Sequence, residues 1–231
     1  MAPCHCKYFR DRSINKFIQA LLLTALAGLI VACAELPLLP PTKAAEQAWQ
    51  ARQQTLSAVR QWSLDGRIAI QAEQQGWHAA LRWSQNITAY DLKLSSPLGQ
   101  DVLQLHGDEN GVVLRTSEGV ERDADAENLL AKHLGWRIPL GGLRYWALGL
   151  PDPQVPVSPQ DRELDGLGRL TRLRQSGWEI EFRRYTPVAG IDLPDKIFLN
   201  NRQTGTQLEV RLVVEKWQID TDNSHTVLNK P

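Results

Sequence analysis

From Trp62 onward, apolar and polar residues alternate along the chain, and this alternation constrains the fold more than any other feature. Leu64, Gly66, Ile68 and Ile70 occupy every second position, as expected for a β-strand with one apolar and one solvated face. The pattern recurs in further short segments, at 77–83, 90–95, 102–105, 112–114, 169–173, 178–184, 196–200 and 207–217. Because short turns join the first of these segments, the spacing predicts an antiparallel meander in a mainly β chain.

Three other segments show features of helices. Residues 44–59 repeat at helical spacing, and the predicted inner side comprises Ala48, Ala51 or Arg52, Thr55, Leu56 and Val59. Residues 123–134 begin with acidic residues, which favour a helix start, and residues 140–148 form a second inserted helix with a strongly apolar side. Gly141 and Gly142 each cost about 1 kcal/mol of helix stability, so this last helix needs an apolar surface on which to dock.

The expected architecture follows from the size of the sheet. A sheet of roughly ten strands must curl or be covered to remove its apolar face from water. The two inserted helices are too few to cover it fully. We therefore expect an unclosed antiparallel β-barrel with helices over its mouth, and an interior that is either filled by side chains or open.

The N-terminal segment has the organisation of a secretory signal peptide, with basic residues first and then an apolar run from Phe17 to Ala32. As a helix this run would be about 24 Å long, shorter than the ~30 Å hydrocarbon core of a membrane. The residues Ile-Val-Ala-Cys that end at Cys33 resemble the bacterial lipobox, in which the cysteine is acylated and exposed by cleavage. An uncleaved membrane anchor is the alternative. The expected organisation is a signal peptide at 1–32, a lipidated proline-rich tether at 33–43, the β domain at 44–219 and a polar tail at 220–231.

Composition narrows the function classes open to the mature chain. Its 22 basic and 25 acidic residues give a net charge of −3, which provides no electrostatic case for binding nucleic acid. Cys4 and Cys6 leave with the leader, so disulfides, thiol catalysis and cysteine-based metal sites are excluded. The four mature histidines are scattered, and the sequence has no hydrolase, nucleotide-binding or metalloprotease motif. We expect no cofactor, no metal and no enzymatic activity; a hydrolase assembled from distant residues is the alternative.

One short stretch departs from the usual polarity of turns. Ser96-Pro97-Leu98-Gly99 separates two predicted strands, yet it carries a leucine at its tip. Pro97 and Gly99 favour a tight turn that directs Leu98 outward. A single surface leucine is common in proteins, so the turn by itself does not require a function.

Four features, in their order along the chain, resemble the LolA/LolB family of lipoprotein localisation factors. They are the lipobox cysteine with its proline tether, the Pro-Leu-Gly turn at 97–99, the segment 138–151 with its Leu-Gly-Leu-Pro end, and Val-Glu-Lys-Trp at 214–217. The resemblance spans nearly the whole mature chain. It implies an unclosed barrel of about eleven strands with helices that cover or plug an apolar cavity.

The resemblance also implies a role for each part. The cavity would receive the acyl chains of lipoprotein cargo from the periplasmic carrier LolA, and the protein, a monomer, would release the cargo into outer-membrane lipid. Acylated Cys33 would anchor it at the periplasmic face of the outer membrane, since Ala34, and not the Asp of inner-membrane retention, follows the cysteine. Leu98, held by Pro97 and Gly99, corresponds to a protruding leucine that delivers cargo to the bilayer. The candidate lining of the cavity is Ile68, Leu81, Trp83, Leu92, Leu94, Leu103, Leu105, Leu140, Leu143, Trp146 and Phe182.

The free energies of burial indicate which residues could anchor the protein and which could act in cargo release. Burying one methylene group contributes about 0.8 kcal/mol, so acyl chains need an apolar shield in water. Leu98 alone gains only about 1.5–3 kcal/mol in a bilayer, which is too little to anchor a protein. We therefore assign anchoring to Cys33 and release to Leu98, and expect the helix at 140–148 to cover the empty cavity and to yield to acyl chains. The competing hypothesis is a structural or ligand-binding envelope lipoprotein with a filled barrel and no transfer role.

Overall fold

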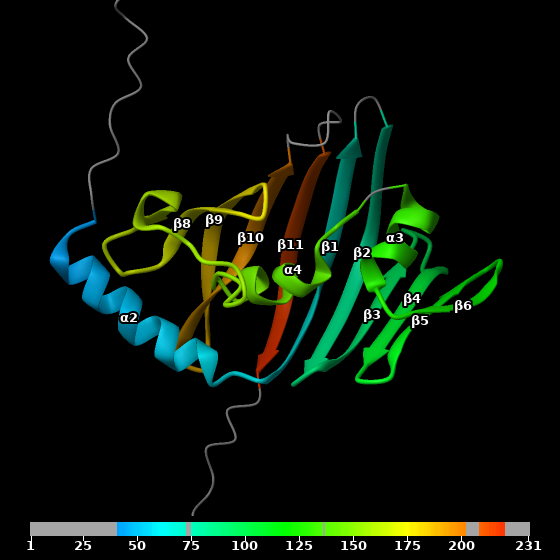
Figure 1. Ribbon diagram of the computed structural model, residues 1–231, viewed down its shortest axis with the longest axis horizontal. Coiled ribbons are helices and arrows are strands. Elements are labelled where there is room, and N and C mark those ends of the chain that lie inside the picture. Colours follow the sequence, from blue (N-terminus) through cyan, green and yellow to red (C-terminus); the bar gives the residue numbers. More distant parts are fainter. Residues whose placement is uncertain (1–40, 73–74, 136, 202–207, 220–231) are drawn as a thin grey trace, which may run out of the picture. The chain divides into compact units, whose positions relative to one another are not determined.

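Eleven strands pair in one antiparallel sheet within the residues that a computed structural model describes, 41–72, 75–135, 137–201 and 208–219 (Figure 1). Their order is β6-β5-β4-β3-β2-β1-β11-β10-β9-β8-β7, so two meanders meet where β1 pairs with β11. The strands are β1 (Gln61–Ala72), β2 (Gln75–Asn86), β3 (Ala89–Ser95), β4 (Asp101–Asp108), β5 (Gly111–Thr116), β6 (Gly119–Asp123), β7 (Arg162–Leu164), β8 (Leu170–Gln175), β9 (Trp178–Val188), β10 (Ile191–Asn201) and β11 (Leu208–Ile219). The prediction of a mainly β, unclosed antiparallel barrel of about eleven strands is confirmed.

The strand register places apolar side chains of one face in continuous rows. One row crosses five strands and consists of Leu64, Trp83, Leu92, Leu105 and Leu114, all of which are buried. Successive side chains of a strand point to opposite sides of the sheet, so the alternating apolar residues of all these strands form a single apolar face.

Strand β1 bends at Gly66, where its register against β11 shifts by one residue. A Cβ atom at Gly66 would collide with the carbonyl oxygen of Val213, so only glycine allows this close approach of the two backbones. The irregularity lies in the strand pair that joins the two meanders.

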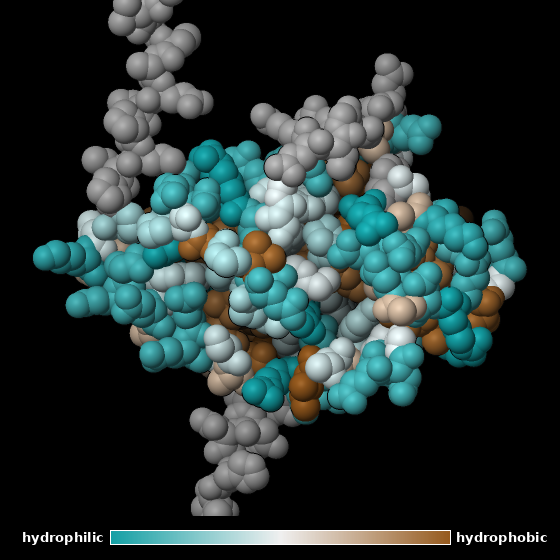
Figure 2. Space-filling model, in the orientation of Figure 1, coloured by the Kyte–Doolittle hydropathy of each residue, from teal (hydrophilic) through white to brown (hydrophobic). Residues whose placement is uncertain are grey.

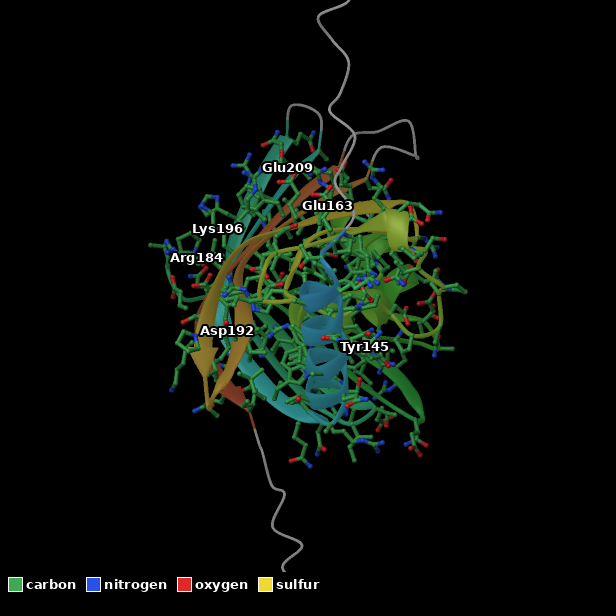
Figure 3. The ribbon with its side chains drawn as sticks, turned by 90° about the vertical axis from the view of Figure 1, so that its left-hand side faces the viewer. Tyr145, Glu163, Arg184, Asp192, Lys196 and Glu209 are labelled. Carbon is green, nitrogen blue, oxygen red and sulfur yellow. The ribbon has the colours of Figure 1, made fainter. Side chains whose placement is uncertain are left out.

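Helices lie on one side of the sheet, and the sheet curves around that side (Figures 1 and 3). They are α2 (Lys43–Ser57), α3 (Ala126–Leu134), α4 (Leu140–Ala147) and the short 3-10 helix η1 (Pro159–Asp161). The side chain of Asp125 accepts a hydrogen bond from the Glu127 amide and so caps α3, and Gly135, with φ 79°, ends it. The predicted helix ranges agree with α2, α3 and α4 to within three residues. No helix of the described residues is long and apolar enough to cross a membrane.

The predicted inner side of α2 is wrong in part. Ala45, Trp49 and Leu56 are its buried residues, whereas Thr55 is exposed. Ala45, Trp49 and Leu56 are spaced as one side of a helix, which is a different side from the predicted one. The turn before β8 packs against α2 here: Gly168, with φ 71°, lies so close to the backbone at Trp49 that a Cβ atom would collide with it.

The apolar core is continuous. One cluster of buried residues includes side chains from α2, α3, α4 and from strands of both meanders. All of these residues belong to one compact unit, 41–231, which therefore contains the complete sheet, the described helices and their shared core.

Candidate functional site

The structure brings all eleven predicted cavity-lining residues into this one core, where each is at most 8% exposed. Those on strands lie on the face that the helices cover. One row joins the two meanders through Ile68, Leu212, Ile197 and Phe182, on four adjacent strands. Helix α4 contributes the remaining three from above the sheet: Leu140, Leu143 and Trp146.

Aromatic residues that sequence reasoning did not assign to the site form the centre of the join between the meanders. The ring of Trp62 lies 5.0 Å from that of Trp83 and 5.5 Å from that of Trp217. The indole of Trp217 donates a hydrogen bond of 2.9 Å to the carbonyl oxygen of Pro194. Their alternation with polar neighbours could have identified Trp62 and Trp217, since both lie at buried positions of predicted strands.

Helix α4 is held to the sheet by one glutamine that the sequence did not single out. Gln175, 5% exposed at the end of β8, accepts hydrogen bonds from the Trp146 indole and the Asp152 amide, both at 2.8 Å. Its amide nitrogen donates to the carbonyl oxygens of Asp152 and Val155 at 2.9 and 2.7 Å. The side chain thereby pairs with the Trp146 indole in the last turn of α4 and with three backbone groups of the segment after it, and so fixes the C-terminal end of this helix.

Charged and aromatic groups connect helix α2 to the meander formed by β7 to β11. Arg162 of β7 pairs with Glu46 at 2.8 Å and lies 5.6 Å from the ring centroid of Trp49. Arg52 donates to the carbonyl oxygen of Asp192 and faces the ring of Tyr185. Burial raises the pKa of Tyr185, whose hydroxyl stays protonated and donates to a backbone carbonyl. These contacts are structural, because they connect elements of the fold to one another.

The turn that carries Leu98 is built as predicted, and its leucine is 90% exposed. The Gly99 amide donates to the Ser96 carbonyl oxygen at 2.8 Å, and the Ser96 amide donates to the carbonyl oxygen of Gln100 at 2.8 Å. Gly99 has φ 83°, a conformation that glycine adopts without strain. Other large apolar residues, Ile87 and Leu167, are exposed by 52% and 64%, so Leu98 is distinguished by degree and by its rigid turn.

The outer face of the sheet is polar and paired. Arg184 and Lys196 point away from the helices (Figure 3), and Arg184 forms an ion pair of 2.8 Å with Asp195. The histidines lie apart: His78 is exposed on β2, whereas His106 contacts Asp91 at 2.8 Å on the outer face. The predicted lipidation site, Cys33, lies outside the described residues.

Fold and site together define an open-barrel protein, in which one curved antiparallel sheet encloses an apolar interior under short helices and presents a leucine at a rigid turn. The model of the family described as outer membrane lipoprotein LolB matches residues 60–217, and the chain belongs to this family. Membership agrees with the resemblance that the sequence motifs indicated.

Curated relatives extend the match. Outer-membrane lipoprotein LolB of Nitrosococcus oceani is 40% identical over 197 residues, which cover 84% of this chain and 95% of that protein. The protein of the same name from Pseudomonas aeruginosa is 38% identical over 173 residues and covers 74% of this chain and 81% of its own. A solved structure of a LolA superfamily protein from Nitrosomonas europaea is 9% identical, with a TM-score of 0.49 over 74% of this chain and 93% of that one. Membership of the family rests on the sequence matches.

Proposed function

We propose that this protein is an outer-membrane lipoprotein that accepts acylated lipoproteins from the periplasmic carrier LolA into its apolar interior and inserts them into the outer membrane. The observation that carries the proposal is the match to the LolB family over residues 60–217, with curated relatives named outer-membrane lipoprotein LolB. The chemistry of the interior supports it, because an acyl chain requires an enclosed apolar surface.

The proposal divides the chain by task. Residues 1–32 are a signal peptide, acylated Cys33 and the tether to residue 43 hold the protein at the periplasmic face, residues 44–219 handle the cargo, and 220–231 form a polar tail. The eleven lining residues receive acyl chains, and Leu98, with Pro97 and Gly99, acts in release. A turn that holds a 90% exposed leucine supports this last role.

A filled interior is the observation that favours the second candidate, a structural or ligand-binding envelope lipoprotein. Trp146 and Leu56 are fully buried, and α4 packs on the apolar face that acyl chains would occupy. Cargo can enter this arrangement only if helices move away from the sheet. The two candidates therefore differ in whether the helices yield to an acyl chain.

The deciding experiment transfers a labelled lipoprotein from LolA to this protein reconstituted in vesicles. We expect the label to leave the carrier and to appear in the vesicle lipid. A second reaction with residues 41–231, free of any lipid anchor, separates acceptance from insertion. Label that remains on LolA in both reactions would exclude the transfer function and leave the envelope-lipoprotein alternative.

A further inference from the structure

A cleft of about 250 Å³ opens between the C-terminal end of α2, the turn between β2 and β3, and the last turn of α4. Figure 2 shows a hollow with apolar residues inside it at this place. The cleft lies at the opposite end of β3 from the Leu98 turn, because Ile87 precedes that strand and Leu98 follows it. It is therefore separate from the proposed release site.

The walls of the cleft carry positive charge without compensation. Arg60 and Arg144 line it, and no carboxylate does. Most other arginines of the fold are paired, as Arg67 is with Glu215 and Arg162 with Glu46. In the described ranges, neither cleft arginine has a carboxylate at ion-pair distance, so both are available to an anion.

Arg144 is held in place to meet such an anion. Its guanidinium lies 4.7 Å from the ring centroid of Tyr145 and donates to the Tyr145 hydroxyl at 3.1 Å. Its Nε, and the amide oxygen of Gln85 in the same wall, are buried without a hydrogen-bond partner among the residues described. Buried polar groups are normally satisfied, so these two are the polar atoms of the wall that a ligand group could pair with.

The remaining surface of the cleft is apolar and leads inward. Trp62 and Leu148, both buried core residues, form part of the lining, and Ile87 stands exposed at the rim. Trp62 contacts the rings of Trp83 and Trp217 in the centre of the join between the meanders. An apolar chain that entered here would thus meet the same core that α4 covers.

We propose that this cleft binds an anionic lipid as a single molecule, with its phosphate on Arg60 and Arg144 and its acyl chain directed toward Trp62 and Leu148. Guanidinium groups suit phosphate because they present several donors in one plane. The apolar lining of the cleft would contact the acyl chain of the lipid, and the two arginines would bind its charged headgroup. The acyl groups of a lipoprotein carry no such charge, so the two arginines distinguish this site from the proposed cargo-lining residues, although its apolar end borders the same core.

The test is calorimetric titration of residues 41–231 with monododecyl phosphate below its micelle concentration. Dodecyl maltoside supplies the same chain without charge, and inorganic phosphate supplies the anion without a chain. We expect monododecyl phosphate to bind at least tenfold more tightly than either. Arg60→Gln and Arg144→Gln should each weaken it about tenfold, as for the loss of one charge-assisted hydrogen bond. Arg115→Gln is the matched control, since Arg115 is exposed on β5, away from the cleft.

Several outcomes would overturn the proposal. Equal affinity for the phosphate and the maltoside would show a purely apolar site, and equal affinity for inorganic phosphate would show a free-anion site. Loss of LolA binding in the two variants, with no binding of monododecyl phosphate, would assign the cleft to a protein partner. Failure of lipoprotein transfer with monododecyl phosphate binding intact would instead count against the proposed function alone.

Discussion

The side chain of Leu98 is 90% exposed, so it gives up few contacts within the fold when it enters a bilayer. Two backbone hydrogen bonds and the positive φ of Gly99 fix the turn before any membrane is met. Insertion of the side chain then costs little conformational entropy. A small apolar contact is sufficient for a step that needs only to orient the protein on lipid.

Replacement of Leu98 by glutamate should therefore slow delivery and leave acceptance unchanged. The lost transfer energy of about 1.5–3 kcal/mol corresponds to a roughly tenfold to hundredfold slower release. The measurement is the rate at which labelled lipoprotein passes from this protein into vesicles. Leu167→Glu, at another exposed leucine in a loop, is the control and should have no effect. Unchanged release by the Leu98 variant would remove this residue from the mechanism.

Gln175 is the residue on which the position of α4 depends. Gln175→Ala should lower the free energy of unfolding by about 2–4 kcal/mol, because polar groups of Trp146, Asp152 and Val155 would lose their partner. Gln104→Ala is the matched control, since Gln104 bonds only to a carboxylate at the surface. Denaturant unfolding measures the free energy of unfolding of both variants. Equal losses would show that the buried hydrogen bonds of Gln175 stabilise the fold no more than the surface bond of Gln104.

Single residues can be predicted from sequence where their polarity is unusual for their position. Residues whose polarity is ordinary for their position are missed. Leu98 could be predicted because a leucine is unusual between proline and glycine. Gln175 could not, since a lone glutamine near a strand end is normally on the surface. Its partners lie 20 to 29 residues earlier, in the last turn of α4 and in the irregular segment after it, and no periodicity connects them.

Among the helices, α4 has two unequal ends. Its C-terminal end is fixed by Gln175 and by the bonds that the Gly149 and Leu150 amides donate back into the helix. Its N-terminal end begins at Pro139, which provides no side-chain cap. We therefore expect the lid predicted from the weak glycines to hinge at its C-terminus instead of lifting as a whole.

Hydrogen exchange should reveal this asymmetry when cargo is bound. The Leu143 amide, which donates to the Pro139 carbonyl oxygen at 2.9 Å, should exchange faster in the loaded protein. The amides of Leu148, Gly149 and Leu150 should stay protected, because the Gln175 contacts persist. Equal protection of Leu143 with and without cargo would contradict a moving lid, and uniform exposure of the helix would contradict the hinge.

The two glycines of α4 offer a direct way to stiffen it. A Cβ atom at Gly141 meets no other atom within 4 Å, whereas one at Gly142 would lie 2.9 Å from the Trp146 ring. Gly141→Ala should therefore stabilise the protein by about 0.5–1 kcal/mol and reduce the rate of cargo acceptance. Gly142→Ala is the contrasting variant and should destabilise. Thermal unfolding together with the transfer assay distinguishes them; faster acceptance by Gly141→Ala would refute the lid.

Elements with one buried face were predictable, and elements at edges were not. The long strands alternate because one side meets the core at every second residue. The edge strands β6 and β7 contain no fully buried residue and leave no such pattern, so the sequence did not reveal them. Helix α2 shows that periodicity can leave the choice of side open: Ala45, Trp49 and Leu56 are spaced as one side of the helix, yet the predicted side included Thr55, which is exposed.

For the molecule as a whole, we expect location and cargo handling to be separable tasks. The core that the described residues form lies within residues 41–231. The cleft escaped sequence reasoning for a related reason: α2, a turn and α4 create it jointly, and none of them marks it alone.

Cys33→Ala, in a secreted form, should still accept cargo from LolA but deliver it less selectively to the outer membrane. The proposed anchor would concentrate the protein at one bilayer, and we expect its loss to leave the interior unchanged. Fractionation of inner and outer membranes after transfer measures the selectivity. Complete loss of acceptance would mean that the acylated cysteine takes part in the handover itself.

The two ends of the sheet, β6 and β7, do not pair with each other. In a closed barrel, strand number and stagger set the circumference, so extra contents are admitted only if ladder bonds break. In an open sheet such as this one, we expect the margins to be able to move apart while every ladder bond persists. Each margin is linked to a helix, Glu121 of β6 to Lys132 of α3 and Arg162 of β7 to Glu46 of α2, and a margin that is covered resists the association with other chains that bare margins invite. We therefore expect the girth of the interior to adapt to its contents, and the proposed cargo site to tolerate acyl groups of different number and length.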